Sequence, residues 1–96
     1  MKALLCEEPG RLAVVTRPRP DRGAGEVLVR IRHVGVCGTD FHIFAGKHRV
    51  LPYPRVMGHE LSGTFEEADD LAPGTPVYIV PYLSCGQCGA CRKGLT

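Results

Sequence analysis

Three cysteines near the end of the sequence, Cys85, Cys88 and Cys91, lie three residues apart in the stretch CGQCGAC. This spacing lets successive thiolates converge on one tetrahedral zinc ion, and Gly86 and Gly89 permit the tight backbone path that such a loop needs. A structural zinc site takes four protein ligands. The triplet therefore predicts a zinc-binding loop whose fourth ligand lies elsewhere.

Other uses of these cysteines fit the sequence less well. An iron–sulfur loop of this type continues with another cysteine followed by proline, whereas Cys91 is followed by RKGLT. The chain has 5 cysteines, an odd number that cannot all pair as disulfides. Regularly spaced free thiols at the surface would be chemically reactive. We therefore favour metal ligands in a reducing compartment.

The chain has 96 residues, 44% of them hydrophobic and 23% charged, which predicts one globular domain with a modest core. Its formal net charge of +2 is too small to indicate a nucleic-acid or anionic membrane partner. Arginines cluster between residues 17 and 32, but prolines interrupt them and no aromatic residue lies nearby to stack on bases, so we interpret them as a solvated face.

No apolar run approaches the length of a membrane span, and Glu7 and Glu8 follow the first residues too closely for a signal-peptide core. We therefore expect a cytoplasmic protein that binds neither nucleic acid nor membrane.

Short apolar, β-branched runs separated by turn residues predict a mainly β fold. With 12 glycines and 8 prolines, long helices are disfavoured. The expected strands cover residues 2–6, 12–16, 26–36, 59–67 and 76–82, and one short helix covers 37–46. The strand over 26–36 alternates and should bury one face. Residues 47–58 read as a loop. The result would be a small β-barrel or bent sandwich.

A second set of metal-binding residue types lies in GVCGTDFH and GHE. Cys37 and His59 offer a thiolate and an imidazole, a combination that suits zinc. Asp40 could accept the other ring proton of a metal-bound histidine, and Glu60 is a neighbouring carboxylate.

Other side chains near these motifs have more modest interpretations. Thr39 and His42 carry a hydroxyl and an imidazole that could pass a proton. We interpret His33 as a strand histidine without a ligand role, and Cys6 as a small buried hydrophobe. His48 reads as a loop histidine whose loop could border a substrate cleft.

The motifs C-G-T-D-x-H, G-H-E and C-x-x-C-x-x-C, in this order after a β-rich start, resemble the amino-terminal catalytic domain of zinc-dependent medium-chain alcohol dehydrogenases. The resemblance implies a GroES-like β fold followed by a Rossmann domain that binds NAD or NADP. Residues 1–96 would then be an incomplete, truncated amino-terminal domain. YPRVMGHE and VPYLSCGQCGACRKG look like the branch that oxidises polyols and sugar acids, including galactonate-type enzymes.

The resemblance also implies roles for particular residues. Cys37 and His59 would bind the catalytic zinc, with Glu60 as an exchangeable ligand and Asp40 orienting the histidine. Thr39 and His42 would form the proton relay. Cys85, Cys88 and Cys91 would be the first three ligands of the structural zinc, with the fourth beyond residue 96.

We therefore expect a homo-oligomeric parent enzyme that oxidises an alcohol, polyol or sugar acid to a carbonyl with hydride transfer to NAD or NADP. No G-x-G-x-x-G occurs in the sequence, so we expect these 96 residues alone to be inactive. The alternative is a free-standing zinc-binding β module that acts as an adaptor.

Overall fold

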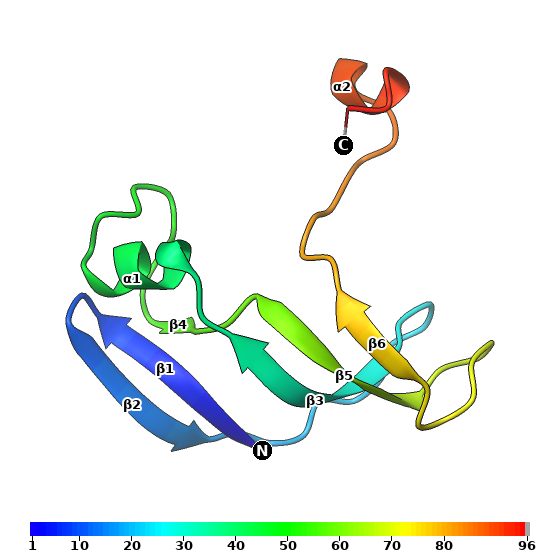
Figure 1. The fold of residues 1–96 in the computed structure, drawn as a ribbon, viewed down its shortest axis with the longest axis horizontal. Helices are drawn as coiled ribbons and strands as arrows, with labels where there is room; N and C mark the ends of the chain where they lie inside the picture. The colour runs from blue at the N-terminus through cyan, green and yellow to red at the C-terminus, as the bar shows by residue number, and fades with distance from the viewer. Residues whose placement is uncertain (96) are drawn as a thin grey trace.

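The computed structural model describes residues 1–95 and contains two antiparallel sheets of three strands each (Figure 1). The first sheet has the order β2-β1-β4, and the second has the order β3-β5-β6. The strands are β1 (Lys2–Glu8), β2 (Arg11–Thr16), β3 (Leu28–Gly35), β4 (Arg55–Val56), β5 (Glu60–Glu67) and β6 (Pro76–Ile79). The helices are α1 (Gly38–Phe44) and α2 (Gly89–Arg92).

The first sheet is built on the strands expected over residues 2–6 and 12–16, which pair as a hairpin. Strands β1 and β2 pair from Lys2 opposite Thr16 to Glu8 opposite Arg11, and Gly10 adopts a φ of 80° in the turn between them. Strand β4 adds to the other edge of β1 with only two residue pairs. The sequence analysis placed β4 inside a loop, because two residues are too few to show an alternating pattern.

The second sheet contains three of the predicted strands, each shorter than expected. Strand β3 pairs with β5 from Leu28 to Gly35, and β5 pairs with β6. The predicted strand over 76–82 was too long, since β6 ends at Ile79. Pro81 follows closely, and a proline cannot donate a backbone hydrogen bond to a neighbouring strand.

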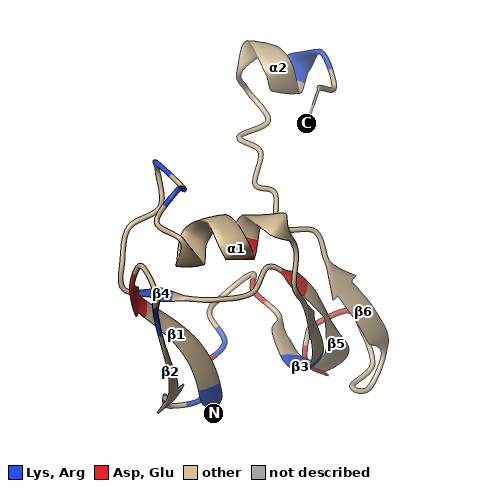
Figure 2. Ribbon diagram, turned by 60° about the vertical axis from the view of Figure 1, so that its left-hand side comes forward, with Lys and Arg blue, Asp and Glu red and all other residues tan. Residues whose placement is uncertain are grey.

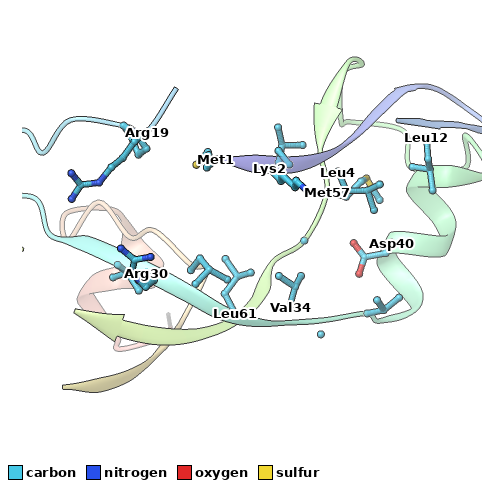
Figure 3. Close-up of a pocket in the computed structure, with 18 of the residues that line it drawn as sticks. Met1, Lys2, Leu4, Leu12, Arg19, Arg30, Val34, Asp40, Met57 and Leu61 are labelled. Carbon is cyan, nitrogen blue, oxygen red and sulfur yellow. The ribbon is translucent and has the colours of Figure 1, made fainter. Parts of the chain in front are cut away.

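The mainly β prediction is confirmed, but the barrel is not closed. Within residues 1–95 no strand of one sheet is hydrogen-bonded to a strand of the other. An open apolar hollow of about 1110 Å³ lies between the sheets, with Leu4 and Met57 on one side and Val34 and Leu61 on the other (Figure 3).

The buried core is correspondingly small. Cys6 is fully buried, which confirms its interpretation as a small core hydrophobe, and Ile43 of α1 is 3% exposed. The prediction that β3 buries one face was wrong, since Ile31 is 41% and Val34 is 53% exposed. Both side chains line the open hollow between the sheets, where the opposite sheet does not cover them.

The arginines between residues 17 and 32 largely face acidic side chains. Arg30 bonds Glu66, and Arg19 lies 3.1 Å from both Glu66 and Glu67, which joins the loop after β2 to the end of β5. The bond from Arg30, followed by that from Arg19, lowers the pKa of Glu66. Exposed pairs of this kind contribute little to stability. Among residues 1–95, no helix is long and apolar enough to cross a membrane.

Gly63 should be essential to the second sheet. It lies on β5 opposite Ile31, and a Cβ at this position would collide with the carbonyl oxygen of Arg30, which cannot move without breaking the strand pairing. We expect Gly63→Ala to lower the free energy of unfolding by about 2–3 kcal/mol.

Urea unfolding of the purified protein checks this expectation. Gly38→Ala is the control, because a Cβ there meets no atom within 4 Å and Gly38 begins α1, where alanine is favourable. Equal unfolding midpoints for the two variants would contradict the collision argument.

Candidate metal centres

The start of α1 fixes the first candidate centre. Cys37 immediately precedes the helix, and its backbone N–H donates to Oδ2 of Asp40 at 3.0 Å. A carboxylate in the first helical turn satisfies a free amide and interacts favourably with the helix dipole. A local hydrogen bond thus holds Cys37 and Asp40 in a defined relation.

The pairing of β3 with β5 brings His59 to the same place. Gly35 at the end of β3 lies opposite Glu60 at the start of β5, so the residues just outside this pair approach each other. The Nε2 atom of His59 lies 3.0 Å from Sγ of Cys37, although the two residues are 22 positions apart in sequence. A thiolate and an imidazole at this separation can bind one ion.

Asp40 completes the group from behind the histidine. Its carboxylate is buried, at 8% exposure, and Oδ1 lies 3.5 Å from Nδ1 of His59 with no hydrogen-bond partner among the described residues. An unpaired buried carboxylate oxygen is costly. A metal-bound histidine would present its Nδ1–H toward this oxygen, the arrangement that orients histidine ligands in metalloproteins. Figure 3 shows Asp40 at the α1 end of the hollow.

The donor set fits zinc. One ligand atom each from Cys37, Asp40 and His59 lie within 4.8 Å of one another. Sulfur and imidazole donors are those that zinc prefers, and catalytic zinc sites keep a position open for substrate. Cys37 and His59 would be the protein ligands, with Asp40 behind them.

The other predicted residues of this site lie nearby but outside the group. Glu60 is exposed, and its side chain lies against Gly35. Thr39 and His42 line a separate shallow hollow on α1, together with residues 47–50. Sequence reasoning had not included Lys47 and Arg49 in any site. The basic run in GKHRV could have indicated that these two residues belong to a site.

The cysteine loop forms the second candidate centre. Sγ of Cys91 lies 3.4 Å from that of Cys88 and 3.8 Å from that of Cys85. Zn–S bonds of about 2.3 Å in tetrahedral geometry place sulfurs about 3.8 Å apart, so the three thiols fit one zinc ion. The one-turn helix α2 follows Cys88 and was not predicted, because four residues show no helical periodicity.

Backbone amides favour the thiolate form in this loop. The N–H groups of Gln87 and Cys88 point to Sγ of Cys85 at 3.4 and 3.3 Å, and these bonds lower the pKa of Cys85 to about 7. A bond from the backbone of Cys91 is the main cause of a lowered pKa at Cys88. Thiolates are the ligand form for zinc, so the loop is electrostatically prepared for a cation.

The fold and the two candidate centres together define a β domain with two groups of zinc-type ligands. The family model of the Alcohol dehydrogenase GroES-like domain matches residues 23–96. The chain therefore belongs to this family, and the predicted GroES-like fold is confirmed.

Individual relatives agree with this assignment. The chain is 40% identical to L-galactonate-5-dehydrogenase of Escherichia coli K12, and the alignment covers 100% of this chain but 29% of that protein. An alcohol dehydrogenase from E. coli CFT073, complexed with NADH, superposes with a TM-score of 0.86 at 38% identity, over 99% of this chain and 28% of the other.

A thermostable alcohol dehydrogenase from Pyrobaculum aerophilum, bound to cobalt and zinc, superposes with a TM-score of 0.86 at 34% identity, over 100% of this chain and 31% of the other. The chain thus spans less than a third of the length of these proteins.

Asp40 should control metal affinity without being a ligand. We expect Asp40→Asn to weaken zinc binding about tenfold to a hundredfold, because an amide cannot hold the Nδ1–H of His59 as a carboxylate does. Competition with a chromophoric chelator measures the affinity. Asp21→Asn is the control, since Asp21 is exposed in the loop after β2. Unchanged affinity in Asp40→Asn would contradict the orienting role.

Proposed function

We propose that this chain is the amino-terminal part of a zinc-dependent dehydrogenase that oxidises a hydroxyl of a polyol or sugar acid to a carbonyl and transfers the hydride to NAD or NADP. Residues 1–96 would be its GroES-like domain, and a Rossmann domain would supply the nucleotide site. The proposal assigns the activity to the complete protein, and the 96 residues alone should be inactive.

One observation carries this proposal: the thiol of Cys37 and the imidazole of His59 meet at 3.0 Å, with the unpaired oxygen of Asp40 behind the histidine. A structural role alone would not require an incomplete ligand pair beside an open apolar hollow. The three-cysteine loop, in contrast, has the composition of a structural site.

Different residues of the chain would have different roles in the oxidation. Cys37 and His59 would hold the catalytic zinc, and Glu60 would be an exchangeable ligand. Bound zinc supplies a Lewis acid that lowers the pKa of the substrate hydroxyl.

Thr39 and His42 would carry the released proton from the hydroxyl toward solvent along α1. Both side chains border the same shallow hollow, which supports a shared path. Cys85, Cys88 and Cys91 would hold the structural zinc.

The comparisons support the substrate and cofactor parts of the proposal. L-galactonate-5-dehydrogenase, by its name, acts on a sugar acid, and one structural neighbour holds NADH. We further propose a homo-oligomer, as is common for soluble enzymes, and a reducing location such as the cytoplasm, where the cysteine ligands stay as thiols.

Assays of the complete protein test the proposal. The purified enzyme should contain zinc, reduce NAD or NADP with a polyol or sugar acid, and lose this activity on treatment with a strong chelator. A zinc-containing protein that oxidises no member of such a panel would favour the adaptor alternative.

A further inference from the structure

A shallow hollow of about 400 Å³ lies beside α1, apart from the hollow between the sheets. Gly46, with a φ of 73°, turns the chain after the helix, and the N–H of Lys47 donates to the carbonyl of His42 at 2.9 Å. The loop therefore folds back on the last turn of α1. The lining residues are Thr39, His42, Lys47, His48, Arg49 and Val50.

The lining of this hollow is cationic. It includes an ammonium and a guanidinium group but no acidic residue among the described lining residues. Within residues 1–95, Lys47 and Arg49 have no carboxylate partner, and neither do some other cations such as Arg17 and Arg32, whereas Arg11, Arg19, Arg22 and Arg30 each have at least one. Figure 2 shows the basic residues of the loop between α1 and β4 in blue.

His48 supplies a second, independent observation. Its Nδ1 atom is buried and has no hydrogen-bond partner in the described part of the chain. A buried polar atom without a partner carries a desolvation cost that a bound ligand oxygen can remove. A fully solvated loop would leave this nitrogen in water. The loop therefore carries both free positive charge and an unsatisfied polar atom.

We propose that this hollow binds the anionic group of the substrate, a carboxylate or phosphate, so that the enzyme selects charged polyhydroxy compounds over neutral polyols. This inference rests on the proposed function. Lys47 and Arg49 supply charge-assisted bonds, and a rearrangement of the loop on binding would expose Nδ1 of His48 to a further hydrogen bond.

The position of the hollow suits a substrate held at both ends. Helix α1 has 7 residues, and a helix of that size is about 10 Å long. Cys37 precedes its first residue, and the basic loop folds against its last turn. Thr39, two residues after Cys37, also lines the hollow, so one sugar acid could place a hydroxyl near Cys37 and its anionic group in the hollow.

The selectivity of the complete enzyme tests this proposal. The substrates are glucitol, gluconate and glucitol phosphate, which share a carbon skeleton and differ in charge. We expect a higher kcat/KM for at least one anion than for glucitol, and the anion preferred identifies carboxylate or phosphate as the ligand. A preference for neutral glucitol overturns the proposal and leaves the proposed function intact.

Charge-removing variants locate the effect. In the double variant Lys47→Gln, Arg49→Gln, we expect the ratio of kcat/KM for the anion to that for glucitol to fall about a hundredfold, at about tenfold per cation. The change should lie mainly in KM, since a charge remote from the reacting carbon binds ground and transition states alike. Arg17→Gln is the control and should keep the ratio, because Arg17 is exposed and has no carboxylate partner in the described part of the chain. An unchanged ratio in the double variant overturns the proposal.

Two further measurements separate the remaining outcomes. If the double variant raises KM for the dinucleotide and not for the anionic substrate, the hollow serves the cofactor and the proposal is wrong. If the protein oxidises no alcohol, the proposed function fails. Titration with gluconate and with inorganic phosphate then tests whether the hollow binds anions. Saturable NMR shifts of the His48 ring, lost in the double variant, support the site, and their absence overturns it.

Discussion

His59→Ala in the complete enzyme is expected to reduce alcohol oxidation at least about a thousandfold. The imidazole of His59 lies 3.0 Å from Sγ of Cys37, and these two side chains are the proposed ligands of the catalytic zinc. Without the ligand, the Lewis acid that lowers the pKa of the hydroxyl is lost, and each factor of ten in rate corresponds to about 1.4 kcal/mol of barrier. Cys37→Ala should behave in the same way.

The measurement combines steady-state kinetics with metal analysis. We expect the zinc content of His59→Ala to fall by one equivalent per chain, while the other equivalent stays in the cysteine loop. His33→Ala is the matched control, because His33 is an exposed strand residue of β3. Activity that persists in His59→Ala at normal metal content would show that this histidine is not a catalytic ligand.

Cys88→Ser is expected to remove the second zinc ion and to disorder the loop around it. Sγ of Cys91 lies 3.4 Å from that of Cys88 and 3.8 Å from that of Cys85, and the loop has few other contacts, since Cys85 and Cys88 are exposed and α2 has only 4 residues. Metal binding and local folding are coupled in such loops, so the loss of one thiolate removes much of the free energy that orders the segment.

Limited proteolysis and metal analysis test this second expectation. Cleavage between residues 84 and 95 should become faster in Cys88→Ser, and one zinc equivalent should be lost while the catalytic zinc remains. Gln87→Ala is the control, because it keeps the backbone amide that donates to Sγ of Cys85 and removes no ligand. A loop that stays protease-resistant without zinc would show that packing, rather than metal, orders it.

The sequence determined the local features of this protein. Thiolate spacing in CGQCGAC follows from chain geometry alone, and Pro9 with Gly10 sets the first hairpin, so both could be predicted without a structure. The carboxylate of Asp40 caps the helix that begins two residues earlier by accepting from the N–H of Cys37, another short-range effect. The bond between Cys37 and Asp40 in the motif C-G-T-D-x-H therefore depends only on residues that are close in sequence.

Tertiary structure decided what depends on distant segments. The register of β3 with β5 places His59 against Cys37, a contact over 22 positions that no local pattern specifies. The two-residue strand β4 exists only because β1 offers it an edge. Periodicity in β3 identified an apolar face, but whether that face is buried depends on the distance between the two sheets, which leaves Val34 beside an open hollow. Likewise, only the fold of the loop after α1 brings Lys47 and Arg49 beside His42, because the backbone turn at Gly46, and not residue type alone, determines which charges share a surface.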